Sequence, residues 1–420
     1  MQILKNKNYY LSMLFSFATL IFLYYPISDI TLSYFHNDDL LLIGRLNNLS
    51  NLNQAINFIF NIEYFKFRPI ANLIYLIEYY AFSDNYNFYI IFNICLVLLA
   101  NHIFLLFFVQ EKKLLTCIFL SLILVSTKFY LYTIWNITGS FEGVAIILFL
   151  LIVRTLFSNV ETLGKRLIFL SLLLILTSER YLPFITLLPV LAYWKKSDKV
   201  MFWSVLLKAK YSAVILSCYF AFRYLVGMPL IVGTQTDDVI ESFSITRVFF
   251  HVIRSYSEIF GFSIGPKYLT GFEFVDWVPF NVLINDPIYI YGFIIGLLLL
   301  IFSFYYYIFK SFVGNKSVFL LNFIGFILIM AASITFRLEL RWLLPSYLML
   351  LLLFSTHSSV GSGDGKYSDV FTFNRTLFIS VISLSVLHNI YYAIFLRRSL
   401  YFAEKLHDAS FVSFFLRFFN

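Results

Sequence analysis

The stretch from Tyr86 to Val109, YNFYIIFNICLVLLANHIFLLFFV, contains no Asp, Glu, Lys or Arg and ends close to Lys112 and Lys113. A helix of about 20 apolar residues crosses the hydrocarbon core of a bilayer. Basic residues beside such a helix tend to stay in the cytoplasm. We therefore predict a membrane-spanning helix here, with its carboxyl end in the cytoplasm.

The composition of the whole chain indicates that lipid is the solvent for most of it. Of the 420 residues, 60% are hydrophobic and 13% are charged, whereas a soluble domain has about 25% charged residues. The net charge of +8 arises from basic residues in short loops, without the basic stripe of a nucleic-acid-binding protein. We predict an all-α polytopic membrane protein whose partner is the lipid bilayer and not nucleic acid.

Similar apolar runs recur along the chain, and the basic residues between them set an alternating topology. This topology predicts about eleven transmembrane helices. The predicted spans are residues 11–27, 86–109, 114–134, 140–157, 167–177, 182–194, 211–226, 287–309, 318–336, 342–354 and 377–395.

Two extracytoplasmic loops of this topology are long. The first, residues 29–68, precedes the run from Pro69 to Phe82, which is too short to cross the membrane comfortably. We expect that run to form a helix at the outer interface, with Pro69 in its first turn. The second loop, residues 227–286, holds an amphipathic stretch from Ile245 to Phe262, for which we also expect a helix.

The predicted domains follow from these assignments. Residues 1–355 form the transmembrane core, residues 356–374 a cytoplasmic linker, and residues 375–420 the last span and a tail. The three cysteines lie in apolar runs without a CxxC pair, and the histidines lack the spacing of paired metal ligands. We therefore predict no disulfide framework, no metal site and no cofactor.

Two adjacent carboxylates, Asp38 and Asp39, lie in the first outer loop, and Arg68 precedes Pro69 at its end. Adjacent carboxylates repel each other, so one can act as a general base near neutral pH. An arginine at a helix amino terminus is suited to bind phosphate. From the residues alone, a solvated acidic loop is favoured for the pair, and a snorkelling side chain is an alternative for Arg68.

Further charged residues lie near the outer ends of predicted spans. Glu142 lies inside an apolar run, where a charge needs a partner such as Lys128 or a function. Ser178-Glu179-Arg180 is by itself typical of an ordinary charged turn. Arg337 and Arg341 share one face if a helix continues through them. They could hold a lipid phosphate or anchor the helix at the interface.

The order of these elements resembles the GT-C superfamily of integral-membrane glycosyltransferases, which includes protein O-mannosyltransferases and the aminoarabinose transferase of lipid A. The similarity covers residue 1 to about residue 355, with Ser178 where a Lys is frequent and Trp342 where a Tyr is common. The matching elements are Asp38-Asp39, Phe67-Arg68-Pro69-Ile70, Asn85 to His102, Trp135 to Glu142, Ser178-Glu179 with Pro183 and Pro189, and Arg337 to Pro345.

The resemblance implies an inverting transfer of sugar from a polyprenyl-phosphate donor to an extracytoplasmic acceptor, in a bacterial plasma membrane. Asp38 or Asp39 is then the general base. The resemblance assigns the phosphate to Arg68, Arg337 and Arg341, and the acceptor or sugar to Glu142 and Glu179. Some distant relatives use a divalent metal at the acidic pair, but nothing in this chain requires one.

A transporter or flippase and an envelope glycan polymerase are the alternative functions. A transporter would carry polar or broken segments near the middle of its spans. The charged residues here gather at outer span ends, which favours an enzyme. A polymerase would place its arginines in large outer loops, and the loop at residues 227–286 keeps that hypothesis open.

Overall fold

A computed structural model of the chain describes residues 7–24, 37–63, 66–83, 85–108, 114–130, 133–134, 136–157, 163–196, 210–225, 245–259, 316–334 and 340–360. These residues are predominantly helical. They belong to two compact units. Unit 1 comprises Met1–Ser126 and Tyr130–Phe243, and unit 2 comprises Thr127–Phe129 and Ser244–Asn420. The predicted core, residues 1–355, extends over both.

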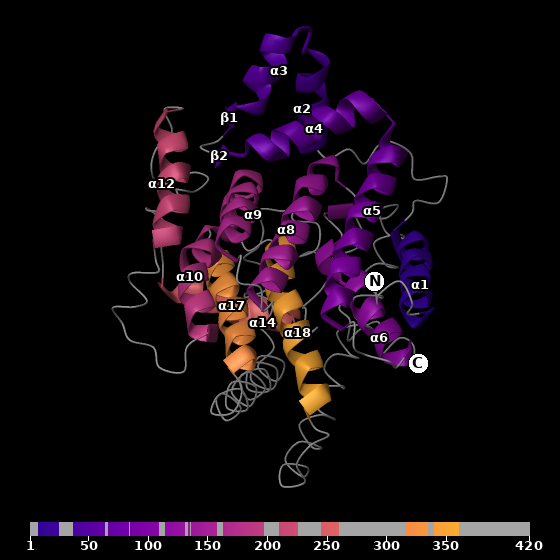
Figure 1. Cartoon of the computed structure of the whole chain (residues 1–420). Helices are drawn as coiled ribbons and strands as arrows, with labels where there is room; N and C mark the ends of the chain where they lie inside the picture. Colours follow the sequence, from indigo (N-terminus) through magenta and orange to yellow (C-terminus); the bar gives the residue numbers. More distant parts are fainter. Residues whose placement is uncertain are drawn as a thin grey trace. The chain divides into compact units, whose positions relative to one another are not determined.

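Unit 1 contains most of the described helices (Figure 1). They are α1 (Lys7–Tyr24), α2 (Asn37–Asn47), α3 (Leu52–Ile59), α4 (Pro69–Phe82), α5 (Tyr86–Leu105), α6 (Leu114–Val125), α8 (Ser140–Phe157), α9 (Leu163–Thr177), α10 (Leu182–Lys196) and α12 (Lys210–Leu225). Short 3-10 turns are η2 (Leu106–Phe108), η4 (Ile137–Gly139) and η5 (Glu179–Tyr181). Strand β1 (Ile62–Glu63) pairs antiparallel with β2 (Lys66–Phe67).

Among the described residues, two helices are long and apolar enough to cross a membrane, Tyr86–Leu105 and Ile137–Leu156. They coincide with the predicted spans 86–109 and 140–157. Several shorter apolar helices, such as Arg166–Thr177 and Ala213–Leu225, lie in other predicted spans. The total of eleven stays a prediction, because residues 287–309 and 377–395 lie outside the described ranges.

The two long helices, α5 and α8, pack directly against each other. Gly143 in α8 allows the close approach: a Cβ atom at this position would lie 3.1 Å from both Cβ and Cδ1 of Leu96 in α5. Small residues let helices approach closely where apolar burial alone gives little specificity. Both helices carry fully buried residues: Val97 lies in α5, and Phe149 of α8 packs against Tyr181 and Phe184.

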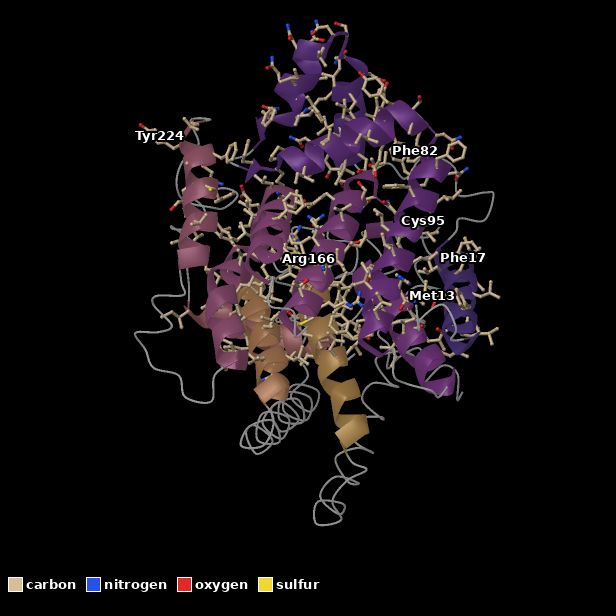
Figure 2. The ribbon with its side chains drawn as sticks, in the orientation of Figure 1. Met13, Phe17, Phe82, Cys95, Arg166 and Tyr224 are labelled. Carbon is tan, nitrogen blue, oxygen red and sulfur yellow. The ribbon has the colours of Figure 1, made fainter. Side chains whose placement is uncertain are left out.

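The predicted helix from Pro69 to Phe82 is confirmed, with the same bounds, as α4. Proline occupies its first turn, where the missing N–H costs no hydrogen bond, and Ser83, at a φ of 50°, ends it. In Figure 1, α4 lies across the ends of α8 and α9, which it contacts. Phe82 packs at the other end of α4 against aromatic residues of α5, including Tyr89 (Figure 2).

The segment before α4 was predicted as a polar loop, but residues 37–59 contain two helices, α2 and α3. Asn51 caps α3 by accepting a hydrogen bond from Gln54 N at 2.9 Å, and Gln54 Oε1 accepts one from Ser50 N at 2.7 Å. This reciprocal arrangement satisfies donors at the helix start. At the other end of α3, the Asn72 amide of α4 donates to the carbonyls of Phe58 and Ile59.

Unit 2 contains α14 (Ile245–Ile259), α17 (Lys316–Ser333), η7 (Leu340–Leu343) and α18 (Leu344–Val360). The predicted amphipathic helix beginning at Ile245 is confirmed as α14, which packs on α17. His251 Nδ1 lies 3.1 Å from the carbonyl oxygen of Ser333. Helix α18 continues to Val360, so the first residues of the predicted linker, 356–360, are helical.

The close contact at Gly143 gives a test of this packing. We expect Gly143→Val to lower the free energy of unfolding by about 1–3 kcal/mol, because the added methyl groups overpack the contact with Leu96. Gly44 in α2 is the matched control, since a Cβ atom there meets nothing within 4 Å. Gly44→Val should therefore change stability little. Thermal unfolding in one detergent measures both variants, and equal stability of the two would contradict the predicted contact.

Candidate functional site

Asp39, one of the two predicted bases, is fully buried at 0% exposure. Its Oδ1 atom accepts a hydrogen bond from the backbone N–H of Thr138 in η4, at 3.0 Å. An N–H donor stabilises a carboxylate and fixes its orientation. A solvated loop is therefore the wrong interpretation for Asp39, which belongs to helix α2. Asp38 lies in the same helix, and its side chain is outside the described residues.

The turn that binds Asp39 is held from two further helices. Asn93 in α5 donates through its amide nitrogen to the carbonyls of Ile134 and Asn136, at 3.2 and 3.0 Å. Tyr75 in α4 donates to the carbonyl of Thr138 at 3.3 Å. Helices α2, α4 and α5 thus fix the backbone that precedes α8. The carboxylate of Asp39 is held against a rigid support.

Arg68 stands immediately before α4 and is half-buried. Its guanidinium carbon lies 5.3 Å from the ring centroid of Phe141 in α8, a cation–π distance. Its carbonyl accepts the hydrogen bond from Asn72 N at 3.0 Å that begins the helix. Arg68 is thereby placed at the positive end of the α4 dipole, where an anion is favoured.

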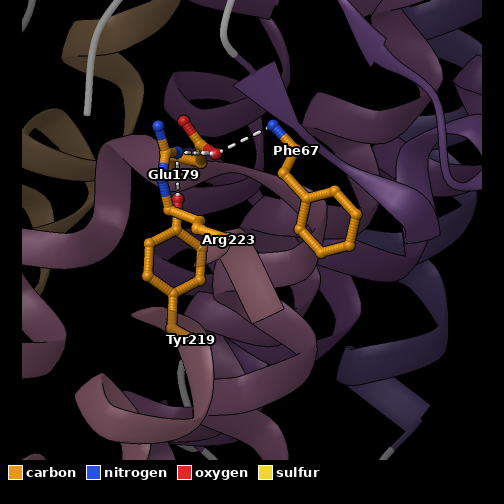
Figure 3. A network of polar contacts seen from close by, with 4 residues as sticks. All are labelled: Phe67, Glu179, Tyr219 and Arg223. Carbon is orange, nitrogen blue, oxygen red and sulfur yellow. Dashed lines mark hydrogen bonds and ion pairs between the residues drawn. The ribbon is translucent and has the colours of Figure 1, made fainter. Parts of the chain in front are cut away.

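Glu179 is the centre of a buried polar network (Figure 3). Its Oε1 atom accepts hydrogen bonds from Phe67 N at 2.9 Å and from Arg223 at 2.8 Å. Arg223, which is fully buried, also donates to the hydroxyl of Tyr219 at 2.8 Å. Ser178-Glu179-Arg180 is therefore not an ordinary exposed turn. Glu179 joins β2, beside Arg68, to η5 and α12.

Arg223 was not identified from the sequence, although a lone arginine inside the predicted span 211–226 is a recognisable signal. A charge in an apolar helix needs a partner, and Glu179 supplies it. The next residue, Tyr224, points outward from α12 in Figure 2 and is 76% exposed. Helix α12 therefore presents Arg223 inward and an aromatic residue outward.

Glu142, in the first turn of α8, forms an ion pair with Arg180 of η5. Glu142 is buried and Arg180 is half-buried. The side chain of Lys128, the predicted partner, lies outside the described residues, so that pairing stays a prediction. Neighbouring residues of η5 thus form separate ion pairs, one with α8 and one with α12.

Glu78 in α4 is a further buried carboxyl, at 2% exposure, and like Arg223 it was not identified as a site residue from the sequence. A single Glu in the apolar run from Pro69 to Phe82 was the available signal. Burial raises the pKa of Glu78 from 4.5 to about 8, and the nearby charge of Asp39 acts in the same direction. A hydrogen bond with Ser140 at 2.9 Å partly opposes this increase.

The structure brings four of the predicted site residues to one end of unit 1: Asp39, Arg68, Glu142 and Glu179. Three of the four meet in one short segment around the start of α8. Asp39 contacts Thr138, Arg68 contacts Phe141, and Glu142 is the next residue. Arg341 lies in η7 of unit 2, and Arg337 is outside the described residues. Within the described part of the chain, no three His, Cys, Asp or Glu side chains gather as metal ligands.

The buried Glu179–Arg223 pair gives a second test. Removing one member of a buried ion pair leaves an uncompensated charge and costs about 3–5 kcal/mol. We expect Glu179→Gln and Arg223→Met each to lower thermal stability strongly. The double variant should lose much less thermal stability than the sum of the losses in the two single variants, because it leaves no unpaired buried charge. Thermal unfolding of the four proteins gives the coupling, and strictly additive losses would argue against the pair. Arg45→Met, at an exposed arginine of α2, is the control.

No family model, no curated protein and no solved structure matches this chain. The function therefore has to be inferred from the chain's own residues and their contacts.

Proposed function

We propose that the protein is a membrane glycosyltransferase of the GT-C type, polytopic with about eleven spans, that moves a sugar from a polyprenyl-phosphate donor to an extracytoplasmic acceptor. The observation that carries the proposal is that a buried carboxylate, Asp39, contacts Thr138 in η4, while a half-buried arginine, Arg68, contacts Phe141 three residues later in α8. A base and a phosphate-binding cation are the two groups that this reaction requires.

The proposed reaction is a direct displacement at the anomeric carbon. The acceptor hydroxyl oxygen forms a bond to that carbon while Asp39 takes the hydroxyl proton. The bond between the carbon and the phosphate oxygen breaks, and the electron pair leaves with the polyprenyl phosphate. Arg68 offsets the charge that develops on the phosphate. Phosphate is a good leaving group, so no strong general acid is needed.

The exposed surface of α4 supports a place at the membrane interface. Ala71, Tyr75 and Leu76 are buried against unit 1, whereas Leu73 and Ile77 on the opposite side are 40% and 60% exposed. A helix that is apolar on its exposed side is suited to the boundary between headgroups and acyl chains. The candidate span α5 begins four residues after α4 ends. Arg68, at the start of α4, would then lie at the depth of a lipid phosphate.

The same arrangement favours an enzyme over a transporter. A transporter binds its ions or substrate near the middle of the membrane, where helices are broken. The ion pairs and the Asp39 contact instead lie at the amino-terminal end of α8, beside η4 and η5. That end is the part of a spanning helix that a surface acceptor would reach.

The choice of base gives the third test. Asp39→Asn keeps the size of the side chain but cannot take a proton, so we expect transfer to fall by about 10²–10⁴-fold. Transfer is measured in membranes with a panel of radiolabelled polyprenyl-phosphate hexoses and pentoses. Asp38→Asn is the neighbouring comparison, and Arg45→Gln, at an exposed position of the same helix, is the control.

Loss in Asp39→Asn with activity retained in Arg45→Gln would support the assignment. Loss in Asp38→Asn alone would move the base to Asp38. Wild-type transfer in both aspartate variants would overturn the proposed mechanism. Absence of transfer from every donor in wild-type membranes would count against the glycosyltransferase itself.

A further inference from the structure

Glu78 and Asp39 approach the same turn from different helices. Asp39 in α2 accepts the N–H of Thr138, and Glu78 in α4 contacts the hydroxyl of Ser140, two residues later. Both carboxyl groups are almost entirely buried, at 0% and 2% exposure. Two ionised carboxylates this close to one turn would repel each other strongly, since burial removes the screening that water gives.

The hydrogen bonds of Ser140 indicate which carboxyl group carries a proton. Ser140 Oγ lies 2.9 Å from Glu78 Oε2 and 3.2 Å from the carbonyl oxygen of Ile137. A hydroxyl has one hydrogen, so it can donate to only one of these oxygens. Both hydrogen bonds form together when Glu78 is protonated and donates to Ser140, while Ser140 donates to Ile137.

Within the part of the chain that the structure describes, no cation pairs with Glu78, and the charge that acts on its pKa is that of Asp39. Among the described side chains of the elements that contact α4, α2 brings Asp39 and the exposed Arg45, α5 brings the phenols of Tyr86 and Tyr89, and α3 brings no charged side chain. Glu142 in α8 is occupied by its ion pair with Arg180, and Arg166 in α9 is exposed. Arg68, at the start of α4, lies over Phe141. Among the described residues, Glu78 Oε1 has no hydrogen-bond partner.

We propose that Glu78 and Asp39 form a carboxyl pair that holds one proton, carried by Glu78, and that Glu78 is a positioning residue for Asp39. The neutral acid completes the hydrogen bonds of the turn and leaves Asp39 as the ionised member, able to accept a proton. The proton on Glu78 is independent of the reaction. The positioning role rests on the proposed glycosyltransferase function.

Ionisation of Glu78 would break this arrangement. The hydrogen of Ser140 would then be drawn to the Glu78 carboxylate and away from Ile137, and Asp39 would face a second negative charge. The pKa of Glu78 is raised to about 8 in the folded protein. The folded state therefore binds a proton that the unfolded state releases above its ordinary value of 4.5. Stability falls as pH rises between these two values, and below 4.5 this contribution does not change with pH.

The first experiment measures thermal unfolding in detergent against pH for wild type, Glu78→Gln and Tyr75→Phe. We expect wild type to lose stability as pH rises towards 8, and Glu78→Gln to lack this decrease because an amide does not ionise. Tyr75→Phe is the matched control: it removes the other hydrogen bond from α4 to this turn, at Thr138, and leaves both carboxyl groups. It should keep the wild-type pH dependence. Parallel curves for wild type and Glu78→Gln would overturn the proposal that Glu78 carries a proton.

Infrared difference spectroscopy of the wild-type protein tests, without any variant, whether a buried carboxyl group carries a proton. Raising the pH from about 6 to about 9.5 should remove a carboxylic acid C=O band, because one buried acid ionises. The midpoint should lie near pH 8. The absence of any acid band that titrates in this range would also overturn the proposal.

The second experiment measures the pH profile of sugar transfer, with each protein compared to its own rate near pH 6.5. Above the pKa of Glu78 we expect the wild-type rate to fall about tenfold for each pH unit. Glu78→Gln should remove this alkaline decrease, whereas Tyr75→Phe should keep it. A retained alkaline decrease in Glu78→Gln would refute the positioning role. If no donor supports transfer, the proposed function fails. Thermal unfolding still decides whether Glu78 carries a proton.

Discussion

The hydrogen bond from Thr138 N–H to Asp39 ties helix α2 to η4, the turn that directly precedes α8. Asp39 and Thr138 are 99 residues apart in the sequence, so chain connectivity does not bring α2 close to this turn. A buried carboxylate without a donor would be very unfavourable, and a buried N–H without an acceptor would also be unfavourable. Each group therefore requires the other. The position of α2, and of the helices packed on it, depends on this mutual requirement.

The remaining charges at this end of unit 1 are accommodated in three further ways. Glu142 and Glu179 are paired with arginines. Glu78 is favoured in its neutral form by its burial. Arg68 rests on an aromatic ring. Arg68 is half-buried, and in the proposed reaction it binds the donor phosphate. Arg223 is fully buried and pairs with Glu179.

The sequence predicted features that depend on long-range periodicity or on local stereochemistry. The bounds of α4 followed from Pro69 and the short apolar run, and the two long apolar helices, α5 and α8, followed from long runs with few charged residues. The sequence did not predict α2 and α3, because short helices depend on tertiary contacts: Asn72 of α4 closes the end of α3. It also did not predict which charges pair. Glu179 and Arg223 are 44 residues apart, and nothing in their spacing identifies them as partners.

The same reasoning applies to the acidic pair, for which the residues alone favoured a solvated loop. Adjacent carboxylates on a solvated loop have no fixed geometry, and a base without fixed geometry contributes little to catalysis. Helix formation over residues 37–47 places neighbouring side chains on different sides of the backbone, because consecutive helical residues are about 100° apart. Asp39 is directed into the protein by this rotation. Among the described residues, a carboxyl group from another helix, Glu78, is near enough for the charge of Asp39 to raise its pKa.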